Sequence, residues 1–217
     1  MGIAILLRHG HSTANAEGLL SGRLPGVTLS ETGERQAREL AAAFDGIDVT
    51  TLSVSPLERT QQTARLVFGD RALIDEPGII ECDYGDWSGR KLSELATEPL
   101  WEQVQRQPSL VRFPNGESLT AMAARSVTTI STRAAGDGLH VFVSHGDIIK
   151  AVISDASGAA FDDFQRIVID PCSISIVYYG EARRLLASNV PISGAAEAIR
   201  GLAKADRGTV GGGGGAA

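Results

Sequence analysis

Short apolar runs alternate with amphipathic segments along most of this chain, and no other feature restricts its fold as much. The apolar runs of strand length cover residues 3–7, 51–54, 73–74, 140–143, 174–178 and 185–190. Segments with helical spacing or helix-start signals cover residues 31–44, 56–68, 118–135 and 148–157. This alternation predicts an α/β fold with a mainly parallel central sheet.

Local side chains predict two of the helix starts. Ser30 precedes the first amphipathic segment and is expected to be its N-cap. Ser55-Pro56-Leu57-Glu58 has the spacing of a capping box, with proline at the first helical position. Residues 10–29 are instead rich in Gly, Ser and Asn, and are predicted to form a long loop of the kind that often carries function.

The length of 217 residues suits one core with a small cap, and residues 1–204 are predicted to form a single domain. Residues 83–116 contain both tryptophans and are irregular with helical pieces, so they are expected to be a cap-like insertion over one end of the sheet. Residues 205–217 include five consecutive glycines and end in two alanines, and are expected to be a disordered tail.

Charge and composition argue against several classes of protein. The net charge of −6 argues against binding to nucleic acid or to an anionic membrane. The apolar run at residues 3–7 is too short to span a membrane and lacks the features of a signal peptide, so a cytoplasmic location is expected. Cys82 and Cys172 are too few for a disulfide framework and are expected to be reduced.

Two histidines occur in the same context, each directly after an apolar run and before a glycine. The motifs are Arg8-His9-Gly10 and Ser144-His145-Gly146. In open α/β sheets, ligands bind outside the carboxyl ends of the strands. Arg59 and Glu81 also follow apolar runs, so all four segments are expected to converge on one pocket.

The residue types in this pocket indicate phosphoryl chemistry. Arg8 and Arg59 offer planar guanidinium groups that suit phosphate oxygens. The backbone N–H groups of Gly10 and Gly146 can face an anion, because glycine allows the backbone to approach closely. The pattern therefore predicts a small phosphorylated substrate as the partner, with no metal or other cofactor.

A phosphoryl site also needs a nucleophile and a proton donor. Neutral imidazole can attack phosphorus near pH 7, and a carboxyl group with a raised pKa can protonate the leaving oxygen. His9 and Glu81 fit these roles. Glu76, Asp83 and Asp86 remain alternatives for the acid, and the role of His11 stays open.

A metal site is the rival interpretation of the same residues. It would be built from His9, His11, His145 and Asp147. The neighbouring arginines would repel a divalent cation, so the phosphoryl interpretation is favoured.

Five blocks of this chain, in order, resemble the histidine phosphatase superfamily, the phosphoglycerate mutase-like proteins. The blocks are residues 7–15 (LRHGHSTAN), 55–64 (SPLERTQQTA), 81–89 (ECDYGDWSG), 113–118 (FPNGES) and 143–146 (VSHG), with Ser21-Gly22 between the first two. A single Arg-His-Gly is a weak signal, whereas five ordered blocks spanning residues 3–190 are a strong one.

The resemblance implies a three-layer α/β/α sandwich and a role for each matched residue. His9 is implied as the phosphorylated nucleophile and Glu81 as the proton donor. Arg8, Arg59 and His145 are implied to hold the phosphoryl group. The substrate side is implied to involve Asn15, Ser21, Gly22 and Gly146. The resemblance also suggests a homodimer.

One departure from the glycolytic mutases of this family bears on the activity. Those proteins carry a longer insertion with paired arginines, whereas the segment from residue 90 to 115 is short here and holds no adjacent arginine pair. The chain is more similar to the short phosphatase-type branch, and to actinobacterial probable phosphomutases. A metal-independent phosphomonoesterase is therefore the leading hypothesis. A phosphomutase is the alternative, and a non-catalytic phosphate-recognition protein is the third.

Overall fold

The computed structural model describes residues 2–204. Its strands are β1 (Gly2–Arg8), β2 (Thr51–Val54), β3 (Ile74–Asp75), β4 (Gly138–Ser144), β5 (Ile174–Tyr179) and β6 (Arg183–Val190). Its α-helices are α1 (Thr13–Glu17), α2 (Glu31–Ala41), α3 (Glu58–Phe68), α4 (Leu92–Leu95), α5 (Pro99–Arg106), α6 (Leu119–Arg133), α7 (Gly146–Ser157) and α8 (Ile192–Arg200). Short 3-10 helices are η1 (Ala42–Phe44), η2 (Pro77–Ile79), η3 (Gly85–Trp87), η4 (Pro108–Leu110), η5 (Phe161–Arg166) and η6 (Gly201–Lys204). The predicted tail, residues 205–217, lies outside the described residues.

The strands form one sheet in the order β3-β2-β4-β1-β5-β6. The first four strands in this order are parallel to one another, and β5 pairs antiparallel with both β1 and β6. A short turn joins β5 to β6, a connection that only antiparallel strands can use. The predicted α/β class is confirmed, with a sheet that is mixed at one edge.

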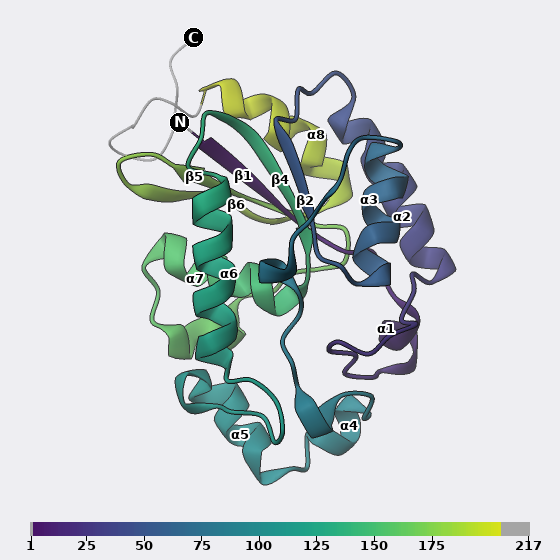
Figure 1. Cartoon of the computed structure of the whole chain (residues 1–217), viewed down its shortest axis with the longest axis vertical. Helices are drawn as coiled ribbons and strands as arrows, with labels where there is room; N and C mark the ends of the chain where they lie inside the picture. Colours follow the sequence, from purple (N-terminus) through teal and green to yellow (C-terminus); the bar gives the residue numbers. More distant parts are fainter. Residues whose placement is uncertain (1, 205–217) are drawn as a thin grey trace.

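Helices cover both faces of this sheet because side chains of a strand alternate between its faces. Leu6 of β1 packs in a core with Met122 of α6 and Ile149 of α7. Its neighbour Ile5 packs on the other face, in a core that also contains residues of α2, α3 and α8, such as Leu40 of α2. Figure 1 shows α6 and α7 on one side of the sheet and α2 and α3 on the other, so the three-layer sandwich is confirmed.

Two helices were not predicted from the sequence, and α1 lies within the predicted loop. Ser12 caps α1, since its hydroxyl accepts from the Asn15 N–H while the Asn15 side chain accepts from the Ser12 N–H. This is a capping box that uses Asn in place of the usual Glu or Gln. The second helix, α8, follows Pro191 and packs Ala195 and Ile199 into the core.

The prediction of a capping box at Ser55-Pro56-Leu57-Glu58 is wrong. Helix α3 begins at Glu58, and its N-cap, Leu57, makes no side-chain hydrogen bond. Ser55 Oγ instead lies 2.7 Å from Nε2 of His145, and the Glu58 carboxylate accepts from the Gly26 N–H at 2.9 Å. Both side chains are used in tertiary contacts, which the local pattern does not reveal.

Residues 83–116 lie across the carboxyl ends of the parallel strands, at the end of the molecule where α4 and α5 are found (Figure 1). The two ends of this segment are bonded to each other. The Asp86 N–H donates to the Pro114 carbonyl at 2.9 Å, and the Glu117 N–H donates to the Asp83 carbonyl at 2.9 Å. The segment thus leaves the sandwich and returns to it at one place.

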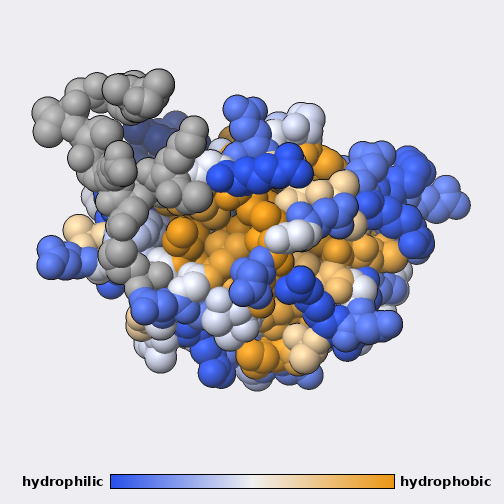
Figure 2. Space-filling view, turned by 90° about the horizontal axis from the view of Figure 1, so that it is seen from above, coloured by the Kyte–Doolittle hydropathy of each residue, from blue (hydrophilic) through white to orange (hydrophobic). Residues whose placement is uncertain are grey.

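Apolar side chains reach the surface at the opposite end of the molecule (Figure 2). A groove between β6 and α8 is lined there by Leu186, Ala187, Ala198 and Leu202. No helix in the described part of the chain is long and apolar enough to cross a membrane.

We expect Leu6→Ala to destabilise the protein by about 2–5 kcal/mol, because Leu6 is completely buried and its truncation leaves a cavity. Leu110→Ala is the matched control, since Leu110 is 65% exposed and its truncation should cost less than about 0.5 kcal/mol. Urea unfolding followed by circular dichroism measures both. Equal losses in the two variants would contradict this account of the core.

Candidate active site

Strand register brings the two histidine motifs together. In the parallel pair β1–β4, Arg8 lies opposite Ser144, and the His9 N–H donates to the Ser144 carbonyl at 2.9 Å. The residue after each strand is a histidine, so the rings of His9 and His145 meet edge to face with centroids 5.3 Å apart. The carboxyl edge of the sheet therefore carries both imidazoles, as the sequence predicted.

Arg59 joins them from the first turn of α3, and its side chain is completely buried. Its Nε donates to Nε2 of His9 at 3.2 Å, and its Nη2 lies 3.2 Å from Nδ1 of His145. Nη2 also donates to the Gly22 carbonyl at 2.8 Å. Gly22 has a φ of 49°, and a Cβ there would lie 2.9 Å from the side chains of Ser88 and Tyr84, so glycine is required at this turn.

These contacts fix the tautomers of both imidazoles, because a guanidinium can only donate. Nε2 of His9 must be an acceptor, so its Nδ1–H donates to the Gly10 carbonyl at 2.7 Å. Nδ1 of His145 is likewise an acceptor, and its Nε2–H donates to Ser55. Burial, followed by the charge of Arg59, holds the pKa of each histidine well below its usual value. Both rings are therefore neutral near pH 7.

Two guanidinium N–H groups at this site are buried without a hydrogen-bond partner. They are Nε of Arg8 and Nη1 of Arg59. The Arg8 guanidinium is held from its other side by the Ile169 carbonyl, and lies against Gly146 at the start of α7. Buried donors of this kind suit the oxygens of a small tetrahedral anion.

Glu81 is buried, and it lines a cavity that Arg8 and His9 also line. Burial, and then the negative charge of Asp147, raises the pKa of Glu81 to about 7. The Glu81 carboxyl can therefore take up and release a proton near neutral pH.

The other carboxyl groups considered for this role do not line the cavity. Glu76 pairs with Arg133 at 2.7 Å. Asp83 lies 3.8 Å from Arg23, and Asp86 accepts from the Asn115 side chain.

A network of charged side chains fixes the backbone around Glu81. The Glu81 carbonyl accepts from Arg23 at 2.8 Å and from Arg125 at 3.1 Å. Glu117 accepts from both of these arginines and from the Asp83 N–H at 2.8 Å. The network ties the loop after α1 and helix α6 to the segment that carries Glu81.

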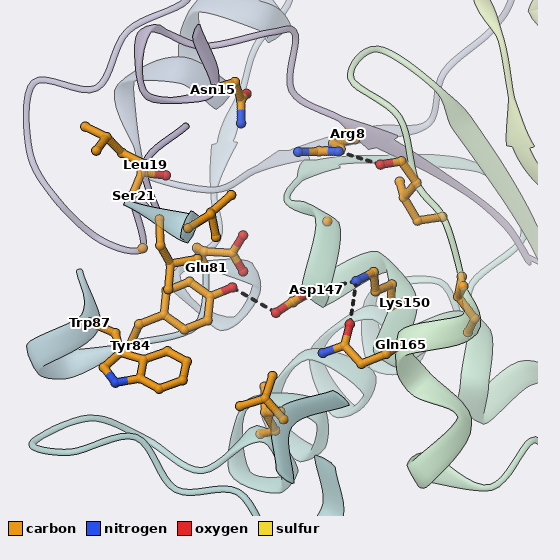
Figure 3. Close-up of a pocket in the computed structure, with 18 of the residues that line it drawn as sticks. Arg8, Asn15, Leu19, Ser21, Glu81, Tyr84, Trp87, Asp147, Lys150 and Gln165 are labelled. Atoms are coloured by element: carbon orange, nitrogen blue, oxygen red, sulfur yellow. Dashed lines mark hydrogen bonds and ion pairs between the residues drawn. The ribbon is translucent and has the colours of Figure 1, made fainter. Parts of the chain in front are cut away.

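The cavity has a volume of about 480 Å³, and Asn15, Ser21, Gly22 and Gly146 line it together with Arg8, His9 and Glu81. Arg59 and His145 do not line it themselves, but both lie directly behind His9. Figure 3 shows the Asn15 amide nitrogen directed into the cavity. His11 does not line it; its Nδ1 lies 2.8 Å from Ser30 Oγ. Residues 2–204 contain no group of three or more His, Cys, Asp or Glu side chains placed to share a metal ion, so the rival metal site is not formed.

Sequence reasoning missed a hydrogen-bonded chain on the far wall of the cavity (Figure 3). The Tyr84 hydroxyl donates to Asp147 at 2.8 Å, and Lys150 lies 3.3 Å from Asp147 and 3.1 Å from Gln165. The Asp147–Lys150 spacing of three residues on a helix was an available signal. Gln165, in η5, had none.

The fold and the site define an α/β protein in which two buried, neutral histidines at the strand ends lie with the buried Arg59 and the half-buried Arg8. The chain belongs to the histidine phosphatase superfamily (branch 1), whose family model matches residues 4–190.

Relatives in this family include both phosphatases and mutases. The chain is 32% identical to the 2,3-bisphosphoglycerate-dependent phosphoglycerate mutase of Thermoplasma acidophilum over 160 residues. This aligned region covers 71% of this chain and 76% of that protein. It is 31% identical over 189 residues to phosphoserine phosphatase 1 of Hydrogenobacter thermophilus, and the alignment covers 84% of this chain and 89% of that protein. The crystal structure of the alpha-ribazole phosphatase from Shigella flexneri matches with a TM-score of 0.77 at 27% identity. The match covers 86% of this chain and 96% of the crystallised one. Membership supports an enzymatic role for this chain.

The raised pKa of Glu81 predicts a pH-dependent stability difference between the wild type and Glu81→Gln. The carboxyl loses its proton near pH 4.5 in the unfolded chain and near pH 7 in the folded protein, so the folded state binds more protons between these values. The wild type should therefore lose stability relative to the variant as pH rises from about 4.5 to 7, with no further change above.

Urea unfolding of both proteins at several pH values measures this difference. Glu102→Gln is the control, since Glu102 is largely exposed and its difference from the wild type should stay flat. A flat difference for Glu81→Gln as well would show that Glu81 is not protonated in the folded protein near neutral pH.

Proposed function

We propose that this protein is a metal-independent phosphomonoesterase that hydrolyses small phosphorylated metabolites through a phosphohistidine on His9. The observation that carries the proposal is the pair of buried, unpartnered N–H groups on Arg8 and Arg59, next to a neutral His9. Such donors are aimed at the oxygens of a phosphoryl group, while Nε2 of His9 supplies the lone pair that attacks it.

In the first step, His9 Nε2 attacks phosphorus, the P–N bond forms, and the P–O bond to the leaving alcohol breaks. The Glu81 carboxyl donates its proton to the departing oxygen. Arg59 Nε, which contacts His9 Nε2 at 3.2 Å, must turn its hydrogen to a phosphoryl oxygen before the attack. The Gly10 carbonyl stabilises the positive charge that develops on the ring, because it accepts from Nδ1–H.

In the second step, water attacks phosphorus and the P–N bond breaks. The Glu81 carboxylate accepts a proton from this water, which restores the acid for the next cycle. Arg8, Arg59 and His145 hold the phosphoryl oxygens throughout, and Asn15, Ser21, Gly22 and Gly146 border the substrate. No step requires a metal ion.

The cations of the insertion favour hydrolysis over a mutase reaction. A bisphosphate needs positive charge on both sides of the site. Arg90 pairs with Glu98 at 2.6 Å and Arg106 with Glu102 at 3.6 Å, and neither arginine lines the cavity. The second phosphate of a bisphosphate would thus lack an arginine from this segment.

We expect His9→Ala to lower phosphate release from phosphomonoesters by on the order of 10⁴-fold or more, since it removes the nucleophile. The assay is phosphate release in excess chelator across a panel of esters. His11→Ala is the matched control, because this imidazole lies outside the cavity, and it should keep most of the activity. Substantial hydrolysis by His9→Ala would refute the assignment. Bisphosphate-dependent isomerisation of 3-phosphoglycerate by the wild type would establish a mutase instead.

Glu81→Gln should separate good from poor leaving groups. kcat/KM for alkyl phosphates should fall by roughly 10²–10⁴-fold, because the alkoxide then leaves without a proton. kcat/KM for 4-nitrophenyl phosphate, which likewise depends only on the steps up to phosphorylation of His9, should fall far less, since nitrophenolate leaves unprotonated. In the wild type, kcat/KM for the alkyl ester should decline above about pH 7, as the Glu81 carboxyl loses its proton. Equal losses for the two esters would exclude Glu81 as the acid.

A further inference from the structure

The part of the cavity beyond Glu81 carries information about the alcohol that the phosphate is attached to. We call it the leaving-group chamber and define it by Tyr84, Trp87, Trp101, Asp147, Lys150 and Gln165. Figure 3 shows Trp87 on the opposite side of the cavity from Arg8, with Glu81 between them. A phosphate held at Arg8 would therefore direct its alcohol into this chamber.

We propose that the substrate is a monophosphate ester of an uncharged or cationic alcohol with substantial apolar surface. Esters whose alcohol carries a carboxylate or a second phosphate are poor substrates. This inference rests on the proposed function and names the substrate class of the same site.

The positive charge in the chamber is already compensated by other side chains of the protein. Beyond Arg8, the cationic side chain of residues 2–204 that lines the cavity is Lys150. Its ammonium lies 3.3 Å from Asp147 Oδ1, 3.1 Å from Gln165 Oε1 and 5.2 Å from the centre of the Phe164 ring. Asp147 is its counter-ion, Gln165 accepts one of its N–H groups, and the Phe164 ring faces its charge. Lys150 is thus not free to bind an anionic group of the substrate.

The chamber holds no uncompensated positive charge. The charges of Asp147 and Lys150 cancel, and both oxygens of Asp147 are in use, one with Lys150 and the other with the Tyr84 hydroxyl. Asp170 also lines the cavity, and its carboxylate accepts from the uncharged Asn189 amide at 2.8 Å. A carboxylate on the alcohol would therefore find no uncompensated cation in the chamber.

Aromatic and aliphatic surface completes the chamber. Trp87 stacks on Trp101 with centroids 6.2 Å apart and an interplanar angle of 26°, and it meets Phe113 edge to face at 5.3 Å. Trp87 is only 3% exposed, so its ring is held firmly by these neighbours. Leu20 and Val104 line the same space. Surface of this kind is covered favourably by an apolar or ring-bearing alcohol.

The test compares three esters whose leaving group is the same type of benzylic alcohol: benzyl phosphate, 4-carboxybenzyl phosphate and 4-(aminomethyl)benzyl phosphate. We expect kcat/KM for benzyl phosphate to exceed that for the carboxylate by at least about tenfold, a difference that one unpaired charge readily produces. The amine should match or exceed benzyl phosphate. A carboxylate ester that is turned over as well as benzyl phosphate would overturn the inference alone. Failure to hydrolyse all three esters and 4-nitrophenyl phosphate would overturn the proposed phosphatase as well.

A variant turns the same comparison into a test of the cause. Asp147→Asn keeps an oxygen for the Tyr84 hydroxyl but releases Lys150 from its counter-ion. The ratio of kcat/KM for the carboxylate to that for benzyl phosphate should then rise at least about fivefold. Because both esters are measured on the same variant, any change at Glu81 cancels from the ratio.

Asp155→Asn is the matched control, since Asp155 lies on the same helix, pairs with Arg183 and does not line the cavity. The ratio should stay at the wild-type value in this variant. An unchanged ratio in Asp147→Asn would show that the committed charge of Lys150 does not cause the selectivity.

Discussion

Arg59 is a fully buried cation, and the arrangement of the site depends on how its charge is accommodated. Burying a guanidinium is costly unless its N–H groups find acceptors. Two neutral imidazoles and the Gly22 carbonyl serve as acceptors here. This arrangement requires the register that sets β1 beside β4, a helix start that brings Arg59 under both rings, and a glycine at the turn that offers its carbonyl.

Burial also shifts the pKa values of His9 and Glu81, in opposite directions. Burial disfavours the charged form of either group, so it lowers the pKa of His9 and raises that of Glu81. Asp147 adds to the effect on Glu81 from the far wall, while Lys150 and Tyr84 hold Asp147 in place. The fold thus places a neutral imidazole and a carboxyl group with a pKa of about 7 in one cavity.

The sequence was sufficient for the parts of the molecule that follow from local periodicity. Strand–helix alternation predicted the sandwich, and because side chains at the ends of parallel strands meet at one edge, it also predicted that His9, Arg59, Glu81 and His145 lie together. Tertiary contacts could not be predicted in this way. Ser55 matched a helix cap but binds His145, since a buried imidazole competes for the same hydroxyl. The Tyr84–Asp147–Lys150–Gln165 chain joins three segments far apart in the sequence, and no local pattern links them.

The segment over the strand ends is closed by hydrogen bonds where it leaves and re-enters the sandwich, between residues 83–86 and 114–117. A loop whose ends are already joined can change in length with little entropic cost to the rest of the fold. The buried arginine and histidines belong to the sheet edge and α3, whereas Trp87 and Trp101 lie between the two closing contacts. Residues 87–112 could therefore be exchanged as one unit, which would change the aromatic wall of the cavity while Arg8, His9, Arg59 and His145 keep their contacts.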